Sequence, residues 1–240
     1  MAAYALTPPE PVRLDLLGGF ACSDSDRDLG LPLVAQRLVA FLALQERPVR
    51  REYVAGRLWT DASETRAHGA LRTALWRIAR IHNGLVWANG PPLALASHVS
   101  VDMHAAIAVA RAVVDGTGPR DDHARRALSV EGDLLPDWYD EWVVFERERL
   151  RQLRLHALEI LCEELTRGGR FAAAADTGLA AVAGDPLRES AHRVLIAAYL
   201  AEGNASDALR QFDIYRRHLA DELGLAPSRR MRVLVASLHD

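Results

Sequence analysis

The sequence predicts a mainly α-helical protein with a small β component: a winged helix-turn-helix followed by an all-helical repeat domain of the tetratricopeptide (TPR) type. Between residues 34 and 96, three segments with helical spacing precede two short apolar runs that flank a turn. From residue 140 onward the spacing is almost wholly helical. Segments 167–176 and 201–210 match each other at an offset of 34 residues, which is the period of TPR helix pairs.

The N-terminal elements begin with a strand. Residues 12–17 (VRLDLL) alternate apolar and polar side chains, and Gly18-Gly19 forms the turn that follows, so we expect a small N-terminal sheet. Helical spacing then runs from residue 34 to 45 and is broken at Pro48. A second helix is expected over about 50–59.

A third helix has one apolar and one basic face. Asp61 and Ser63 are good N-cap residues for it, and Glu64 suits its first turn. The expected buried stripe consists of Ala67, Leu71, Ala74, Leu75 and Ile78. The opposite face carries Arg66, Gly69, Thr73, Trp76, Arg77 and Arg80, with no acidic residue among them.

Two apolar runs after this helix, LVW (85–87) and LALA (93–96), flank the turn-forming sequence ANGPP. This pattern predicts a β-hairpin. Helix, helix, basic helix and hairpin is the element order of a winged helix-turn-helix.

Charge also divides the chain, for which we expect two domains at 1–101 and 102–240. All 29 basic residues are arginine. Residues 1–100 carry a net charge of +2, residues 101–240 carry −5, and residues 37–80 alone carry +5. A basic module is therefore joined to an acidic one.

The C-terminal half contains helical patterns near 103–115 and around 121–129. An aromatic-rich segment with Trp138, Tyr139, Trp142 and Phe145 then leads into one long amphipathic helix. The aromatic side chains are interpreted either as core or as an exposed partner-binding patch, and packing is the favoured interpretation.

Several classes of function lack their motifs. A P-loop needs a lysine, which the chain does not contain, and neither a G-x-S-x-G elbow nor a kinase signature is present. Cys22 and Cys162 lie far apart without metal-ligand spacing, and the histidines lack such spacing too. We therefore expect no enzyme activity, cofactor or metal. With no apolar run near the length of a membrane span, we expect a cytoplasmic protein with no membrane partner.

The sequence resembles the Streptomyces antibiotic regulatory protein (SARP) family over nearly its whole length. LLGGF (16–20), RLVAFLALQERPV (37–49) and ALRTALWRIAR (70–80) are similar to its OmpR-type winged helix. The segment from Gly132 to Leu155, with PLRESAHRVLIAAYLAEGN (186–204) and LADELGLAPS (219–228), resembles its bacterial transcriptional activation domain. Two positions depart from the family: Arg50 stands where a Ser or Thr cap is common, and Pro91-Pro92 where a basic wing residue is common.

The resemblance implies a transcriptional activator that binds promoter direct repeats as paired protomers and recruits RNA polymerase. Its partners would be double-stranded promoter DNA, RNA polymerase and a second copy of the chain, at the nucleoid. The expected DNA-binding residues are Arg66, Gly69, Arg72, Thr73, Trp76, Arg77, Arg80, Arg50, Arg51 and Asn89. The expected partner-binding residues are Trp138, Tyr139, Trp142 and Arg188.

Two other functions remain open at this stage. One is a TPR-type adaptor whose winged helix has lost useful DNA affinity, and the other is a ligand-responsive regulator. The function of Trp76 is also open, between contact with DNA, cover for an arginine stem and packing against a neighbouring element, of which packing is slightly favoured.

Overall fold

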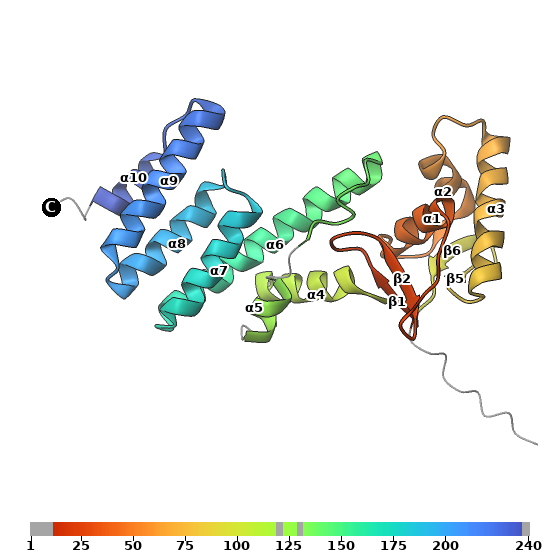
Figure 1. Cartoon of the computed structure of the whole chain (residues 1–240), viewed down its shortest axis with the longest axis horizontal. Helices are drawn as coiled ribbons and strands as arrows, with labels where there is room; N and C mark the ends of the chain where they lie inside the picture. The colour runs from red at the N-terminus through yellow and green to blue at the C-terminus, as the bar shows by residue number, and fades with distance from the viewer. Residues whose placement is uncertain (1–11, 119–121, 129–131, 237–240) are drawn as a thin grey trace, which may run out of the picture. The chain divides into compact units, whose positions relative to one another are not determined.

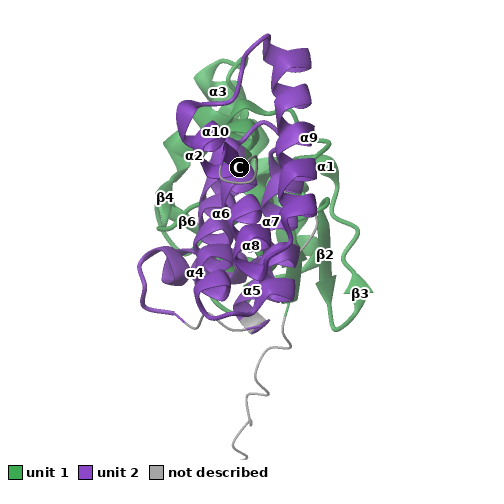
Figure 2. Ribbon diagram, turned by 90° about the vertical axis from the view of Figure 1, so that its left-hand side faces the viewer, with its two compact units in different colours: residues 1–104, 131–147 green, residues 105–130, 148–240 purple. Residues whose placement is uncertain are grey.

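The computed structural model describes residues 12–118, 122–128 and 132–236. The chain forms two compact units that are not continuous in sequence, coloured separately in Figure 2. The first comprises residues 1–104 and 131–147, and the second comprises 105–130 and 148–240. The boundary expected at residue 101 lies close to residue 104, where the chain first leaves the N-terminal unit. The sequence did not predict that residues 131–147 also belong to this unit.

The first unit opens with a four-stranded sheet in the order β3-β2-β1-β7. The strands are β1 (Val12–Asp15), β2 (Ala21–Asp24), β3 (Arg27–Asp28) and β7 (Ser100–Val101), and β7 runs parallel to β1. Next to β7, the carboxylate of Asp102 accepts hydrogen bonds from the backbone N–H groups of Leu16 (3.0 Å) and Leu17 (2.9 Å). This contact joins the end of β1 to the start of helix α4 (Asp102–Val114).

Three helices and a three-stranded sheet complete the winged helix (Figure 1). The helices are α1 (Leu33–Ala43), α2 (Arg51–Leu58) and α3 (Glu64–Ile81). The predicted hairpin is present as β5 (Val86–Trp87) and β6 (Pro92–Leu95), and β6 also pairs with β4 (Val49–Arg50), a strand that the sequence pattern did not predict. The apolar stripe of α3 is buried at Ala67, Leu71, Ala74 and Ile78, while Leu75 is half-buried.

The returning segment, residues 132–147, completes the core of this unit. Leu134 forms a β-bridge with Leu17, and the N–H of Leu135 donates to the carbonyl of Leu16 at 2.9 Å. Both leucines are buried, as is Trp142, whose ring packs edge-on against Phe41 with centroids 5.2 Å apart. The segment is therefore part of the packing of the winged helix.

The second unit is built from successive helices, most of which run along one another in Figure 1. They are α4 beyond its first turn, α5 (Asp122–Leu128), α6 (Glu141–Arg167) from residue 148, α7 (Phe171–Gly184), α8 (Glu189–Glu202), α9 (Ala205–Leu223) and α10 (Arg229–Ala236). Helices α7 and α9 begin 34 residues apart, which is the offset found in the sequence. The glycines that precede them, Gly169 and Gly203, share the same offset and both have a left-handed backbone, with φ of 70° and 88°.

Small residues allow these helices to pack closely. A Cβ atom added to Gly178 on α7 would lie 3.0 Å from the side chain of Leu195 on α8. Helix α8 begins at Glu189, and Pro186 lies in the turn that precedes it. Within the described residues, no helix combines the length and hydropathy needed to cross a membrane.

Candidate nucleic-acid interface

Helix α3 exposes a continuous basic surface. Arg66, Arg72, Thr73, Trp76, Arg77 and Arg80 are exposed, and Gly69 is half-buried among them. The hydroxyl of Thr73 donates to the carbonyl of Gly69 at 3.0 Å, so its lone pairs remain free to accept. The single acidic residue of α3, Glu64, lies in its first turn. The arginines therefore form a surface suited to phosphates and to guanine edges.

Trp76 belongs to this exposed surface. Its side chain is 58% exposed, and the guanidinium carbon of Arg80 lies 5.0 Å from the ring centroid. The favoured expectation that Trp76 packs against a neighbouring element is wrong. The tryptophan instead makes a cation–π contact with Arg80, and both residues are exposed.

Arg51 connects helix α2 to the wing. Its guanidinium donates to the carbonyl oxygens of Ala88 (3.0 Å) and Gly90 (3.3 Å), which lie in the β5–β6 turn. Asn89, between those two acceptors, is exposed at the wing tip. Arg50 is also exposed and lies opposite Pro92 in the β4–β6 pair. Arg51 therefore holds the wing in place, while Arg50 and Asn89 remain accessible.

A pocket of about 390 Å³ lies between α3 and the wing. Four of the predicted DNA-binding residues line it, namely Arg51, Arg72, Trp76 and Asn89. The structure thus brings together residues that are up to 38 positions apart in sequence. Arg66 lines a different pocket near the start of α3, together with Arg57.

The predicted partner-binding aromatic residues have different environments. Trp142 is 6% exposed, and Trp138 is half-buried, stacked on Phe20 with centroids 5.9 Å apart and edge-on to Trp142. Both belong to the core of the first unit, in line with the favoured packing interpretation, so their assignment to a partner surface is corrected. Tyr139 and Phe145 are 85% and 69% exposed.

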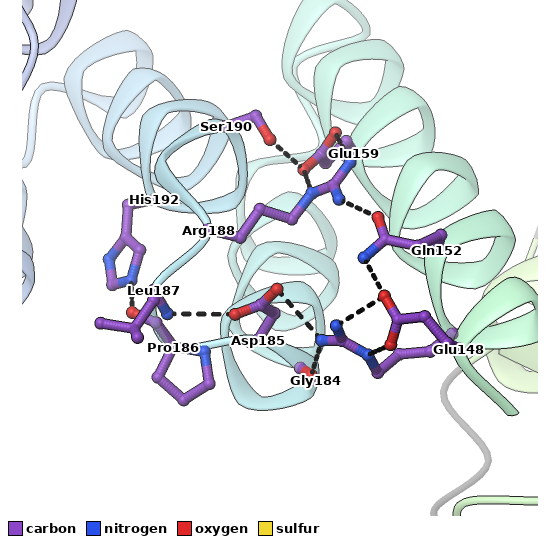
Figure 3. A network of polar contacts seen from close by, with 11 residues as sticks. Glu148, Gln152, Glu159, Gly184, Asp185, Pro186, Leu187, Arg188, Ser190 and His192 are labelled. Carbon is purple, nitrogen blue, oxygen red and sulfur yellow. Dashed lines mark hydrogen bonds and ion pairs between the residues drawn. The ribbon is translucent and has the colours of Figure 1, made fainter. Parts of the chain in front are cut away.

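Arg188 also lies inside a unit, in a network that joins α6 to the start of α8 (Figure 3). Its Nε donates to Glu159 at 2.6 Å and its Nη1 to Gln152 Oε1 at 2.6 Å, and Glu159 is only 8% exposed. The assignment of Arg188 to a partner surface is therefore corrected, because its guanidinium balances a buried carboxylate.

The same network continues along α6. Gln152 donates to Glu148, and Arg151 bridges Glu148 and Asp185 at 2.9 and 3.0 Å. Hydrogen bonds from Arg151 and then Gln152 hold the pKa of the Glu148 carboxyl below its usual value. These contacts fix the α7–α8 turn against α6.

The two cysteines are buried and free, and burial raises the pKa of Cys22 to about 11 and that of Cys162 to about 12. Both remain protonated thiols near neutral pH and are poor nucleophiles. Across the described ranges, no cluster of three or more His, Cys, Asp or Glu side chains suits a metal ion.

Two exposed residues of the surface were not in the predicted set. Trp87 on β5 is 43% exposed on the wing, and Asn83 lines the pocket between α3 and the wing. The run LVW marked Trp87 as strand, but only the register of β5 with β6 determines which of its residues are exposed.

Comparison with known proteins identifies the family. Residues 102–239 match the family profile described as "Bacterial transcriptional activator domain", which is more than half of the chain. Over 208 residues the chain is 28% identical to the regulatory protein AfsR of Streptomyces coelicolor, covering 82% of this chain and 21% of AfsR. The chain belongs to the SARP family of transcriptional regulators.

This SARP-family regulator also shares its fold with a solved structure, EmbR of Mycobacterium tuberculosis in complex with a low affinity phosphopeptide. The two structures have a TM-score of 0.73 at 23% identity, and the likeness covers 96% of this chain and 65% of EmbR. The predicted fold class, mainly α with a small β component, is confirmed. The SARP-family regulator spans less than two thirds of the length of either protein.

Proposed function

We propose that this regulator activates transcription by binding promoter DNA in a sequence-specific manner through α3 and the wing. The observation that carries the proposal is the exposed face of α3, which presents Arg66, Arg72, Arg77 and Arg80 on a helix whose one acidic residue, Glu64, lies in its first turn. An arginine in the major groove can donate two hydrogen bonds to guanine, and its neighbours can hold phosphates.

The wing supports the same function from the other side of the pocket. Asn89 and Arg50 are exposed there, and Arg51 restrains the loop that carries Asn89. In winged proteins of this geometry the helix occupies the major groove while the wing reaches the flanking backbone. Pro91 and Pro92 add no charge to the wing, so α3 supplies most of the binding energy.

The second unit supplies contacts between proteins in this proposal. One winged helix covers a short site, and useful specificity requires two protomers on repeated half-sites. We assign the TPR-like helices and the exposed Tyr139 to protomer pairing and to RNA polymerase recruitment. The acidic C-terminal region would not compete for DNA.

The test compares Arg77→Ala with Arg230→Ala, an exposed arginine on α10. The binding site is first recovered by genome-wide mapping of the tagged protein, and affinity is then measured by fluorescence anisotropy at several salt concentrations. Arg77→Ala should weaken binding about tenfold or more, as expected for loss of a base or phosphate contact of roughly 1–3 kcal/mol. Arg230→Ala should leave affinity unchanged.

Equal affinities of the two variants would remove α3 from the interface. If no fragment is enriched and no salt-dependent binding is found, the chain is instead an adaptor that acts through its helical unit.

A further inference from the structure

A second pocket, of about 540 Å³, lies on the first unit away from the wing. It is bordered by the end of α2, the α2–α3 turn, the start of α3 and the start of α6. We propose that this pocket binds a small molecule that bears a carboxylate or phosphate group, which makes the protein a ligand-responsive regulator.

The pocket has an unused buried donor in its wall. Trp142 lines it and is 6% exposed, and among the described residues its indole Nε1 has no hydrogen-bond partner. A buried N–H without an acceptor costs about 1–3 kcal/mol, so such groups usually meet a partner. Because this nitrogen is sealed from solvent, an acceptor oxygen of a bound molecule would reach it through a shift of the Trp142 ring or of the side chains that cover it.

Two unpaired arginines lie on the same pocket. Arg57 on α2 and Arg66 on α3 are exposed, and their side chains make no ion pair or hydrogen bond within the described residues. A third arginine, Arg37, is engaged, since it donates to Asp140 Oδ1 at 2.5 Å and to the carbonyl of Leu58 at 3.1 Å. That pair neutralises Asp140 and leaves Arg57 and Arg66 as the available cations.

Two helix N-termini add to the positive potential. Helix α3 begins at Glu64, and the side chain of its N-cap residue, Ser63, makes no capping hydrogen bond. Helix α6 begins at Glu141, and both helices are long, with 18 and 27 residues. Free N–H groups at the start of a helix favour bound anions.

The carboxylates of the pocket narrow the class of ligand. Asp61 and Glu141 are exposed on its lining and oppose a polyanion such as a run of DNA phosphates. A compact molecule with one anionic group and a hydrogen-bond donor, such as an amino acid or a phosphorylated alcohol, matches the mixture of charges.

The position of the pocket gives the ligand a route to DNA binding. Its walls include the turn that precedes α3 and the first residues of α6, and Arg37 already joins the end of α2, at Leu58, to Asp140 just before α6. A molecule held by Arg57, Arg66 and Trp142 would bridge them and stabilise one placement of α3. Ligand binding at this pocket itself does not depend on the proposed DNA contacts.

The test uses ¹H–¹⁵N spectra of the full-length protein, in which the indole signal of Trp142 is assigned with Trp142→Phe. The probes are acetate, succinate, glutamate, glycerol phosphate and inorganic phosphate at up to about 10 mM, which detects a Kd of about 1 mM. We expect at least one probe to shift the Trp142 indole signal in a saturable manner. Arg57→Gln with Arg66→Gln should weaken that probe about tenfold or more, and Arg47→Gln, outside the pocket, should leave it unchanged.

Two results would overturn the proposal. One is the absence of any shift at Trp142 with every probe, or an equal shift in the double variant. The other is a shift that duplex DNA alone produces, which would make the pocket part of the DNA interface. Failure of DNA binding with an intact probe response would contradict only the proposed function.

Discussion

His192 shows how a single polar side chain is accommodated in the helical core. It is fully buried on α8, where its Nε2 lies 2.9 Å from the carbonyl of Pro186 and its Nδ1 lies 2.8 Å from Gln211 Nε2. The amide of Gln211 can donate to Nδ1, so the network assigns the proton to Nε2. Burial lowers the pKa of His192 from its ordinary value of 6.5, although the Pro186 carbonyl opposes this shift. The folded protein therefore keeps His192 neutral.

Stability should fall as the solution is acidified below about pH 6.5. The unfolded chain binds a proton at this histidine near its ordinary pKa, whereas the folded chain binds it only at lower pH, so acid favours unfolding. The contribution of neutral His192 to the free energy of unfolding is fully present above pH 6.5. Below that pH it falls by up to about 1.4 kcal/mol per pH unit, until the pKa of His192 in the folded protein is reached. Urea unfolding between pH 7.5 and 5.5 measures this slope. His192→Gln should reduce the dependence of stability on pH, whereas His156→Gln, at an exposed position, should leave it unchanged. Equal slopes in the parent and both variants would contradict the role given to His192.

At the scale of elements, single arginines join segments that the backbone does not connect. Arg51 holds the wing, and Arg147 donates to the carbonyls of Leu134 (2.6 Å), Leu135 and Trp138 (2.8 Å) in the segment before α6. A guanidinium has five donors in a rigid plane, so it can satisfy several carbonyls of an irregular segment at once. The guanidinium hydrogen bonds therefore hold these irregular segments in place where no helix or strand supplies backbone hydrogen bonds.

Replacing Arg51 by alanine should loosen the wing without unfolding the unit. The hydrogen bonds to Ala88 and Gly90 are lost, at a cost of about 1 kcal/mol for a partly exposed contact. Hydrogen exchange should accelerate at residues 86–95 and stay slow in α3, and DNA affinity should weaken several-fold. The matched control is Arg47→Ala. Unchanged exchange in the wing of the Arg51 variant would show that this tether is unimportant.

Replacing Arg188 by alanine should destabilise the helical unit. Glu159 would remain buried without its cation, and breaking a buried pair in this way costs roughly 3–5 kcal/mol. Thermal unfolding followed by circular dichroism measures the loss, with the exposed pair member Arg216→Ala as control. Arg188→Ala with Glu159→Leu should recover part of the stability, and a single variant as stable as the parent would contradict the role given to this pair.

At the scale of the whole molecule, the chain leaves the first unit for the second, returns to the first, and then enters the second unit again. Residues 131–147 belong to the first unit although they follow helices of the second. They bring Leu134, Leu135, Trp142 and Val143 into its core, each less than a tenth exposed. The N-terminal unit therefore depends on residues that lie beyond its apparent end in the sequence.

A fragment that ends at residue 104 should not fold cooperatively. It lacks four buried apolar side chains, each worth roughly 1.5–3 kcal/mol, and this loss approaches the whole stability of a small domain. A fragment of residues 1–147 retains those four side chains. Urea titration followed by tryptophan fluorescence compares the two, and a sharp transition in the shorter fragment would show that the returning segment is dispensable.

The sequence by itself determined the fold class, the order of the helices and the basic face of α3. These features follow from local periodicity, because a helix with apolar residues at three- and four-residue spacing has one buried face wherever it packs. The 34-residue offset between α7 and α9 was likewise visible, since the repeat recurs in the chain itself. The proposed DNA-binding residues on α3 were also predicted from the sequence alone.

Only the tertiary structure decided which long-range partners each residue meets. Trp142 and Arg188 were both predicted to bind a partner. Trp142 is instead buried against Phe41, and Arg188 is half-buried in an ion pair with Glu159, because these residues, distant in sequence, pack against them. Trp76 looked suited to packing and is exposed beside Arg80. Periodicity specifies which face of a helix is buried but not the neighbour that covers it. The returning segment, the hydrogen bonds from Arg51 to the β5–β6 turn and the pocket at Trp142 are therefore visible only in the folded chain.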